Sequence, residues 1–198
     1  GWPDVIVSNL SDNSISIFSN AGVAGDIVPG SLNDRVNFWT GAHPMAFSIG
    51  DLDGDGKRDI TVANQFSNSI SLLRNTSIPG TINSGTLAGK VDFPTWTYPS
   101  WIGLCDFDRD SKPDIAVLNA SSNVVSFFRN KIPEPPTPVI SSFTPASGPV
   151  GTEVTITGMN FNPVADNNYV WFGAVKATVS SATPSQLIVK VATGATYH

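Results

Sequence analysis

The sequence contains one cysteine and no apolar run of membrane-spanning length. Cys105 alone excludes an internal disulfide and a cysteine-based zinc site, although a lone cysteine is compatible with either redox compartment. No segment approaches the ~20 consecutive apolar residues of a transmembrane helix, so we expect no membrane span. We expect Cys105 to be a small, buried strand residue.

Basic residues are also few. The chain has 11 Lys and Arg against 16 Asp and Glu, a formal net charge of −5, and the basic residues are scattered. Nucleic acids and anionic membranes require a concentrated basic face, so neither is an expected partner. The acidic residues, by contrast, are clustered: fourteen of the 16 are Asp, and eight of those lie in two nine-residue windows.

Helical periodicity is absent as well, since no apolar helical pattern persists for three turns. Val, Ile and Phe recur instead in short runs, separated by turns that use many of the 17 Gly and 15 Pro. With 40% hydrophobic and 14% charged residues, the composition is that of a globular chain. The pattern predicts an all-β protein.

A repeat of 55 residues runs through the first 130 residues. A strand motif that starts with aspartate and ends with asparagine begins at Asp4, Asp59 and Asp114. The register between the units needs no gaps, and it also aligns Asn20, Asn75 and Asn130. Within one unit we expect four strands, at residues 45–50, 59–64, 69–74 and 90–93.

Four short strands at this period indicate a β-propeller blade, with a solenoid as the alternative. About two and a half repeats precede residue 131, whereas propellers typically close with roughly four to eight blades. We therefore expect a partial propeller over residues 1–131. The register also places Gly1 inside a repeat, so we expect a truncated N-terminus, or else chains that associate to complete the ring.

Two aspartate-rich loops recur at the 55-residue spacing of the repeat, at residues 51–59 and 106–114. Each has carboxylates at positions 1, 3, 5 and 9, which would repel one another strongly without a cation among them. A backbone carbonyl at position 7 is a further candidate ligand. This set of hard oxygen donors suits Ca²⁺ better than Mg²⁺. The candidate ligands are Asp51, Asp53, Asp55, Lys57 and Asp59 in the first loop, and Asp106, Asp108, Asp110, Lys112 and Asp114 in the second.

Two other interpretations of the loops agree less well with the sequence. An EF-hand is excluded, because it needs a glutamate at position 12 and a following helix, whereas Val62 and Val117 stand there in strand-like runs. Ordinary aspartate turns would explain one loop, but fit poorly with two loops in step with the repeat. Ser111 replaces Gly56 where a positive φ is usual, so we expect a weaker or differently shaped second site.

Residues 51–75 and 106–130 resemble the FG-GAP/VCBS-type repeats of integrin α-subunits and bacterial surface proteins. That resemblance implies blades whose aspartate loops bind Ca²⁺ through the carboxylates named above, with Asp4 as the last ligand of a truncated site. Only a partial match to the Phe-Gly…Gly-Ala-Pro signature is present, at Gly41-Ala42-His43-Pro44. The resemblance is therefore closer to the bacterial branch.

A proline-rich linker, residues 132–138, separates the repeats from a region without them. Residues 139–198 contain short alternating runs at the spacing of a β-sandwich. The segments 139–152, 154–161 and 170–173 resemble an IPT/TIG domain, which implies an immunoglobulin-like fold used as a spacer or interaction module. We expect its last strand to be missing, leaving an edge open to strand addition.

No residues form a plausible catalytic group, because His43 and His198 lack suitable partners, so we do not expect an enzyme. Trp39, Trp96 and Trp101 are candidates for stacking on sugar rings or for packing between blades. We expect a calcium-binding adhesion or binding module, secreted or on a bacterial cell surface, with an extracellular protein or glycan as ligand. The alternatives are an accessory region of a larger secreted polysaccharide-active enzyme, or a surface filament that self-associates through incomplete propeller or sandwich edges.

Overall fold

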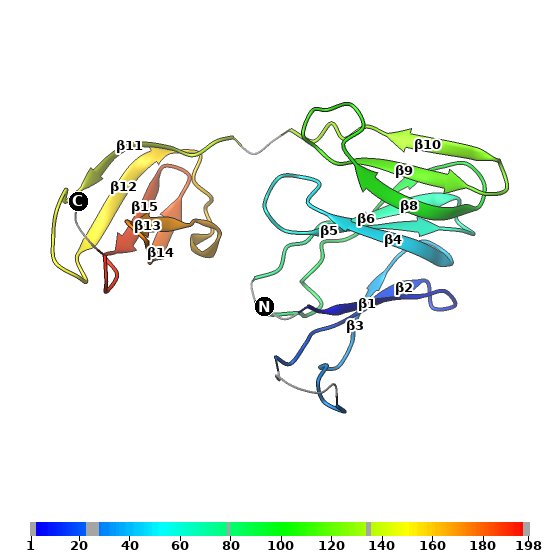
Figure 1. Cartoon of the computed structure of the whole chain (residues 1–198), viewed down its shortest axis with the longest axis horizontal. Coiled ribbons are helices and arrows are strands. Elements are labelled where there is room, and N and C mark those ends of the chain that lie inside the picture. The colour runs from blue at the N-terminus through cyan, green and yellow to red at the C-terminus, as the bar shows by residue number, and fades with distance from the viewer. Residues whose placement is uncertain (1–2, 23–27, 79, 134–135, 196–198) are drawn as a thin grey trace. The chain divides into compact units, whose positions relative to one another are not determined.

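The computed structural model describes residues 3–22, 28–78, 80–133 and 136–195. The chain divides into two compact units, residues 1–134 and 135–198, which we describe separately. Within the described ranges, the regular elements are strands except for one short 3₁₀ helix, Ala165–Asn167 (Figure 1). The predicted all-β class, a partial propeller with an immunoglobulin-like domain, is confirmed.

The first unit consists of three antiparallel sheets, in which strands adjacent in the chain are paired (Figure 1). The middle sheet has the four strands predicted for a blade, each within one residue of its predicted bounds at either end. They are β4 (Pro44–Gly50), β5 (Asp59–Asn64), β6 (Ser69–Leu73) and β7 (Val91–Pro94). The flanking sheets are β1 (Val5–Asn9), β2 (Ser14–Phe18) and β3 (Val36–Trp39), and β8 (Pro99–Cys105), β9 (Asp114–Asn119) and β10 (Val124–Phe128).

A tight turn links β1 to β2, β5 to β6 and β9 to β10, and it is built the same way in all three sheets. Asn13, Asn68 and Asn123 occupy it with φ values of 53°, 51° and 52°. Asparagine tolerates this left-handed conformation better than most residues, and it matches the twist of a tight hairpin. The repeat therefore specifies the hairpins locally.

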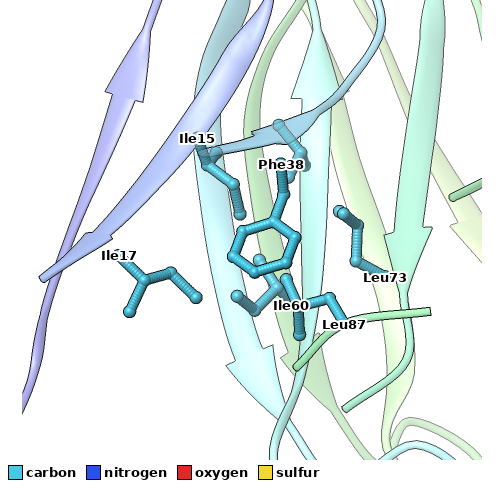
Figure 2. Packing of buried hydrophobic residues seen from close by; sticks show 7 residues of the cluster. Ile15, Ile17, Phe38, Ile60, Leu73 and Leu87 are labelled. Atoms are coloured by element: carbon cyan, nitrogen blue, oxygen red, sulfur yellow. The ribbon is translucent and has the colours of Figure 1, made fainter. Parts of the chain in front are cut away.

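Hydrophobic clusters join consecutive sheets. Between the first and the middle sheet, Ile15, Ile17 and Phe38 pack on Ile60 and its neighbours (Figure 2). Between the middle sheet and the third, a second cluster consists of Ala63, Ile70, Ile102, Ile115 and Val117. Both faces of the middle sheet are covered, which explains why every residue of β5 is buried. Each such Ile or Val contributes about 1.5–3 kcal/mol.

A buried polar network lies inside the middle sheet. The amide of Asn64 donates to Ser69 Oγ at 3.2 Å and to Ser71 Oγ at 2.8 Å, while its Oδ1 accepts the N–H of Gly41 at 3.1 Å. Ser71 in turn donates to Asp92 Oδ1 at 2.7 Å. The side chain of Asn64 is fully buried, so these bonds replace all of its contact with water.

The flanking sheets repeat this network. Asn9 donates to Ser14 Oγ at 3.1 Å and to Ser16 Oγ at 2.7 Å. Asn119 donates to Ser126 Oγ at 2.9 Å, and its Oδ1 accepts from Thr95 Oγ1 at 2.8 Å. The asparagine that ends each strand motif therefore has a structural role, which the sequence pattern alone did not reveal.

The second unit is one five-stranded antiparallel sheet in the order β11-β12-β15-β14-β13. Its core contains Val154, Ile156, Phe161, Leu187 and Val189. A cavity of about 550 Å³ is lined by residues of both edge strands, so the sheet is strongly curled. The strands are β11 (Val139–Thr144), β12 (Glu153–Met159), β13 (Val170–Phe172), β14 (Val175–Thr183) and β15 (Gln186–Lys190).

Cys105 was expected to be buried, which is wrong: it is the last residue of β8, where the sheet ends, and it is exposed. The boundary between the units falls within the predicted linker 132–138, whose Glu134 and Pro135 lie outside the described residues. The predicted loss of a last strand concerns the chain after His198, and residues 196–198 also lie outside the described residues.

We predict that Asn64→Ala lowers the free energy of unfolding by about 2 kcal/mol, because it leaves buried donors and acceptors unpaired. The matched control is Asn9→Ala, which removes the same kind of bonds at a half-buried position and should cost less. Urea denaturation of both variants measures the difference. An equal or smaller loss at Asn64 would contradict the role given to this network.

Candidate metal centre

The two aspartate-rich loops occupy equivalent places in consecutive sheets. Residues 51–58 connect β4 to β5, and residues 106–113 connect β8 to β9. In each loop the fourth aspartate is already the first residue of the following strand. The sheet therefore fixes one end of each carboxylate cluster.

The strand aspartate of the first loop is buried and joins three segments of chain. Asp59 Oδ2 accepts the backbone N–H of Leu52 at 2.9 Å, and its Oδ1 accepts the backbone N–H of Asn75 at 2.8 Å. The side chain of Asn75 also donates to the carbonyl of Arg58 at 3.0 Å. Asp59 therefore fastens both the loop and the segment after β6 to the start of β5.

The second loop has the same arrangement. Asp114 Oδ2 accepts the N–H of Phe107 at 3.1 Å, and its Oδ1 accepts the N–H of Asn130 at 2.8 Å. The side chain of Asn130 donates to the carbonyl of Pro113 at 3.2 Å, and to that of Leu52, in the preceding sheet, at 2.7 Å. Asn130 thus connects the two loops.

A third copy of this pair occurs at the start of the chain. Asp4 Oδ1 accepts the N–H of Asn20 at 2.8 Å, and the side chain of Asn20 donates to the carbonyl of Pro3 at 3.2 Å. The partner asparagines Asn20, Asn75 and Asn130 were visible in the sequence only as matched positions. Their spacing of 16 residues from each aspartate was the available signal.

The first aspartate of each loop organises the turn. Asp51 accepts the N–H groups of Gly54 and Gly56, both at 2.8 Å. Asp106 likewise accepts the N–H of Asp110 at 3.1 Å and that of Ser111 at 2.9 Å. These bonds close each loop around its carboxylates.

Three of the four predicted carboxylates in each loop converge. Each offers an oxygen, and these oxygens lie within 4.8 Å of one another. The first group is Asp51, Asp53 and Asp59, and the second is Asp106, Asp108 and Asp114. The fourth carboxylates, Asp55 and Asp110, are not members of these groups.

In the first loop, Asp55 and Asp53 face an arginine. Arg74 Nε lies 2.5 Å from Asp53 Oδ2, and its Nη2 lies 3.2 Å from Asp55 Oδ2. Lys57, predicted as a carbonyl ligand, donates its N–H to Asp55 Oδ1 at 2.9 Å. More than half of the Arg74 side chain is exposed, so solvent screens this pair and it adds little stability.

In the second loop, Arg129 has the same role. It pairs through Nε with Asp108 Oδ2, and its Nη2 lies 3.5 Å from Asp110 Oδ2. The N–H of Lys112 donates to Asp110 Oδ1 at 3.0 Å. Arg74 and Arg129 are a repeat apart, and sequence reasoning did not identify either as part of the loops.

The two strand aspartates differ in their electrostatics. Burial raises the pKa of Asp59, with Asp53 and Asp55 adding to the effect, while two backbone N–H groups oppose it. The N–H of Asn130 is the main cause that lowers the pKa of Asp114, assisted by Phe107 and Arg129. A cation among the carboxylates would favour the ionised form of both.

The second loop keeps the conformation of the first without its glycines. Gly54 and Gly56 have φ of 75° and 83°, and their equivalents Arg109 and Ser111 have φ of 65° and 70°. These φ values do not show the predicted difference in shape, but Asp106 accepts the N–H of Asp110 where Asp51 accepts that of Gly54. Side chains at such φ values cost of order 1 kcal/mol each, so the second loop is strained.

The donor set is compatible with a hard divalent cation. Each convergent group consists only of carboxylate oxygens, which Ca²⁺ and Mg²⁺ prefer, with no imidazole or thiolate to favour zinc or copper. The geometry therefore supports a site for a hard divalent cation in each loop.

The sheets define the first unit as part of a β-propeller, and the second unit has an immunoglobulin-like fold. Family models agree: an FG-GAP-like repeat matches residues 1–62 and again 51–117, and an IPT/TIG domain matches residues 138–196. The chain therefore belongs to the FG-GAP-like repeat family and carries an IPT/TIG domain. Both are binding-type, non-catalytic domains. No curated protein and no solved structure matches the chain.

Among the described residues, no helix has the length and apolar character to cross a membrane. FG-GAP-like and IPT/TIG domains are typical of extracellular proteins.

We predict that Arg109→Gly and Ser111→Gly each raise the free energy of unfolding by about 1 kcal/mol, because glycine relieves the positive φ. Arg109→Ala is the control, since it removes the same side chain but keeps the backbone strain. Thermal and urea unfolding in the presence of a chelator measure the effect. Stabilisation of the alanine variant by the same amount would show that the side chain, not the backbone, is responsible.

Proposed function

We propose that this chain is a calcium-binding extracellular module that recognises a protein or a glycan, without catalytic activity of its own. One observation carries the proposal: two loops, one repeat apart, each gather three carboxylates at equivalent positions. A single cluster of acidic residues in a turn would be explained by exposure of the carboxylates to water. The repetition of the same convergent geometry in consecutive blades favours a shared ligand.

The proposed ligands in the first loop are the carboxylates of Asp51, Asp53 and Asp59. Asp55 and the carbonyl of Lys57 would add to them, since Ca²⁺ takes about 6–8 oxygens. Asp106, Asp108 and Asp114 hold the second ion, with Asp110 and the carbonyl of Lys112. Two such ions would change the formal charge from −5 to about −1. Bound Ca²⁺ then stiffens the connection between the first two strands of each blade.

The proposed ligand class rests on exposed aromatic rings in the first unit. The side chains of Trp39 and Trp96 are 71% and 61% exposed. Large rings at a surface provide flat apolar area for a sugar ring or a protein side chain. The two domain types and the resemblance of the repeats support an extracellular, bacterial setting.

The arginines favour a second possibility, in which the loops are structural and need no ion. Arg74 and Arg129 each pair with two carboxylates of their loop. In that case the guanidinium groups supply the positive charge that faces the carboxylates. The two possibilities differ in one property, the affinity for Ca²⁺.

We predict that titration calorimetry of the full chain detects two Ca²⁺ per molecule. Asp59→Asn and Asp114→Asn should each remove one, because each loses a charged oxygen of one convergent group. Calcium at about a hundredfold above its Kd should stabilise the fold by about 2.7 kcal/mol per site. Thermal unfolding with Ca²⁺ and with chelator measures that shift.

The matched control is Asp4→Asn, which alters the same aspartate–asparagine pair where no convergent group is described. It should keep both ions. No heat of binding together with equal melting temperatures in Ca²⁺ and chelator would support the ion-free loops instead. Loss of binding in Asp4→Asn would show that the losses at Asp59 and Asp114 reflect damage to the fold.

A further inference from the structure

An arginine lies against the carboxylates of each aspartate-rich loop. Arg74 directly follows β6, and Arg129 directly follows β10. The next residue in each case, Asn75 or Asn130, has its N–H held by the strand aspartate of that loop. Because this hydrogen bond fixes the backbone beside each arginine, the side chain reaches the loop from a defined position.

Each guanidinium contacts a carboxylate of a convergent group. Arg74 Nε lies 2.5 Å from Asp53 Oδ2, and Asp53 is one of the three residues whose oxygens converge in the first loop. In the second loop, Arg129 pairs through Nε with Asp108, which has the same place in the second group. A cation bound by either group would therefore share a carboxylate with a guanidinium.

The second contact of each arginine is with a further proposed ligand. Arg74 Nη2 lies 3.2 Å from Asp55 Oδ2, and Arg129 Nη2 lies 3.5 Å from Asp110 Oδ2. Because Ca²⁺ takes about 6–8 oxygens, it would recruit these carboxylates as well. Each arginine thus engages two of the carboxylates that the ion would use.

The arginine is not needed to build the repeat. By the 55-residue register, the equivalent position of the first sheet is Ser19. The aspartate–asparagine pair forms there as well, since Asp4 accepts the N–H of Asn20 at 2.8 Å. The side chains of Arg74 and Arg129 are 57% and 59% exposed, so either can move into water without disturbing the hydrophobic core. The positive charge is therefore an addition to each loop and not part of its frame.

We propose that Arg74 and Arg129 set the calcium affinity of their loops, because each competes with the ion for the same carboxylates. This inference rests on the proposed function, since it concerns the ion bound there. When Ca²⁺ binds, a guanidinium must either stay beside a divalent charge or give up its carboxylates and move into water. Both alternatives oppose binding, so each arginine weakens the affinity of its loop.

The size of this effect follows from the charges. A unit charge a few ångströms from a divalent ion changes the binding constant by about tenfold, even at the dielectric constant of water. Calcium sites of extracellular modules have Kd values of about 10⁻⁴–10⁻³ M. An affinity lowered toward that range makes the occupancy of the loops follow the surrounding calcium concentration. The arginines then make the loops responsive to calcium instead of permanently loaded.

Titration calorimetry of the full chain with calcium chloride tests the proposal, at about 0.15 M salt to screen distant charges. Arg74→Gln should tighten one of the two sites about tenfold and leave the other unchanged. Arg129→Gln should tighten the other site, and the double variant should tighten both. Arg74→Lys keeps the charge, so its affinities should stay closer to those of the wild type than the affinities of Arg74→Gln do.

The matched control is Lys90→Gln. Lys90 pairs with Asp92 of β7, in the same sheet as the first loop but outside that loop. Its replacement changes the net charge as much as Arg74→Gln does, but it should leave both binding constants within about twofold of the wild type.

Thermal unfolding gives a second readout. In chelator, Arg74→Gln should melt below the wild type, because an ion pair is lost. At a calcium concentration near the wild-type Kd, it should melt above the wild type, because tighter binding stabilises the folded state more. An arginine with only a structural role would give a variant that melts below the wild type in both conditions, and that result would contradict the proposal.

The outcomes separate this proposal from the proposed function. Two bound ions in the wild type, with unchanged affinities in both glutamine variants, would overturn the role of the arginines and leave calcium binding intact. Equal tightening in Lys90→Gln would also overturn it, because net charge alone would then explain the effect. Binding by the double variant but not by the wild type would support the competition and contradict the proposed function. No binding by either protein would overturn both.

Discussion

A buried carboxylate at the start of the second strand of a blade is the interaction on which the first unit depends. Asp59 and Asp114 each use one oxygen to hold the preceding loop and the other to hold an asparagine that follows the third strand. Hydrogen bonds to charged groups contribute about 1.5–3 kcal/mol each. The same carboxylate also belongs to a convergent group. A change at Asp59 or Asp114 therefore affects both the hydrogen bonds of the blade and the candidate ion site.

Polar contacts of this kind also fix how blades stack. Hydrophobic packing between sheets is not directional, so it specifies neither register nor spacing. One hydrogen bond between sheets supplies both, since Asn130 reaches the Leu52 carbonyl in the preceding sheet. Asn64 and Asn119 also accept donors from Gly41 and Thr95, which lie in the segments that link one sheet to the next.

Much of this architecture could be predicted from the sequence, because a repeat in constant register reveals strands, hairpins and loops at once. Contacts between distant positions could not. Nothing local shows that Asn75 meets Asp59, or that Arg74 turns toward Asp53 and Asp55. Cys105 was misjudged for a related reason, since strand periodicity describes burial within a sheet but not at its end, where β8 opens into the loop.

Amide hydrogen exchange of the full chain tests most directly whether the carboxylate, the loop and the ion act as one unit. We expect Ca²⁺ to slow exchange at the N–H groups held by Asp59 and Asp114, which are those of Leu52, Asn75, Phe107 and Asn130. The N–H of Asn20, held by Asp4, should be unaffected, because no convergent group is found at Asp4 among the residues that the structure describes. Equal exchange with Ca²⁺ and with chelator at all five positions would contradict this account.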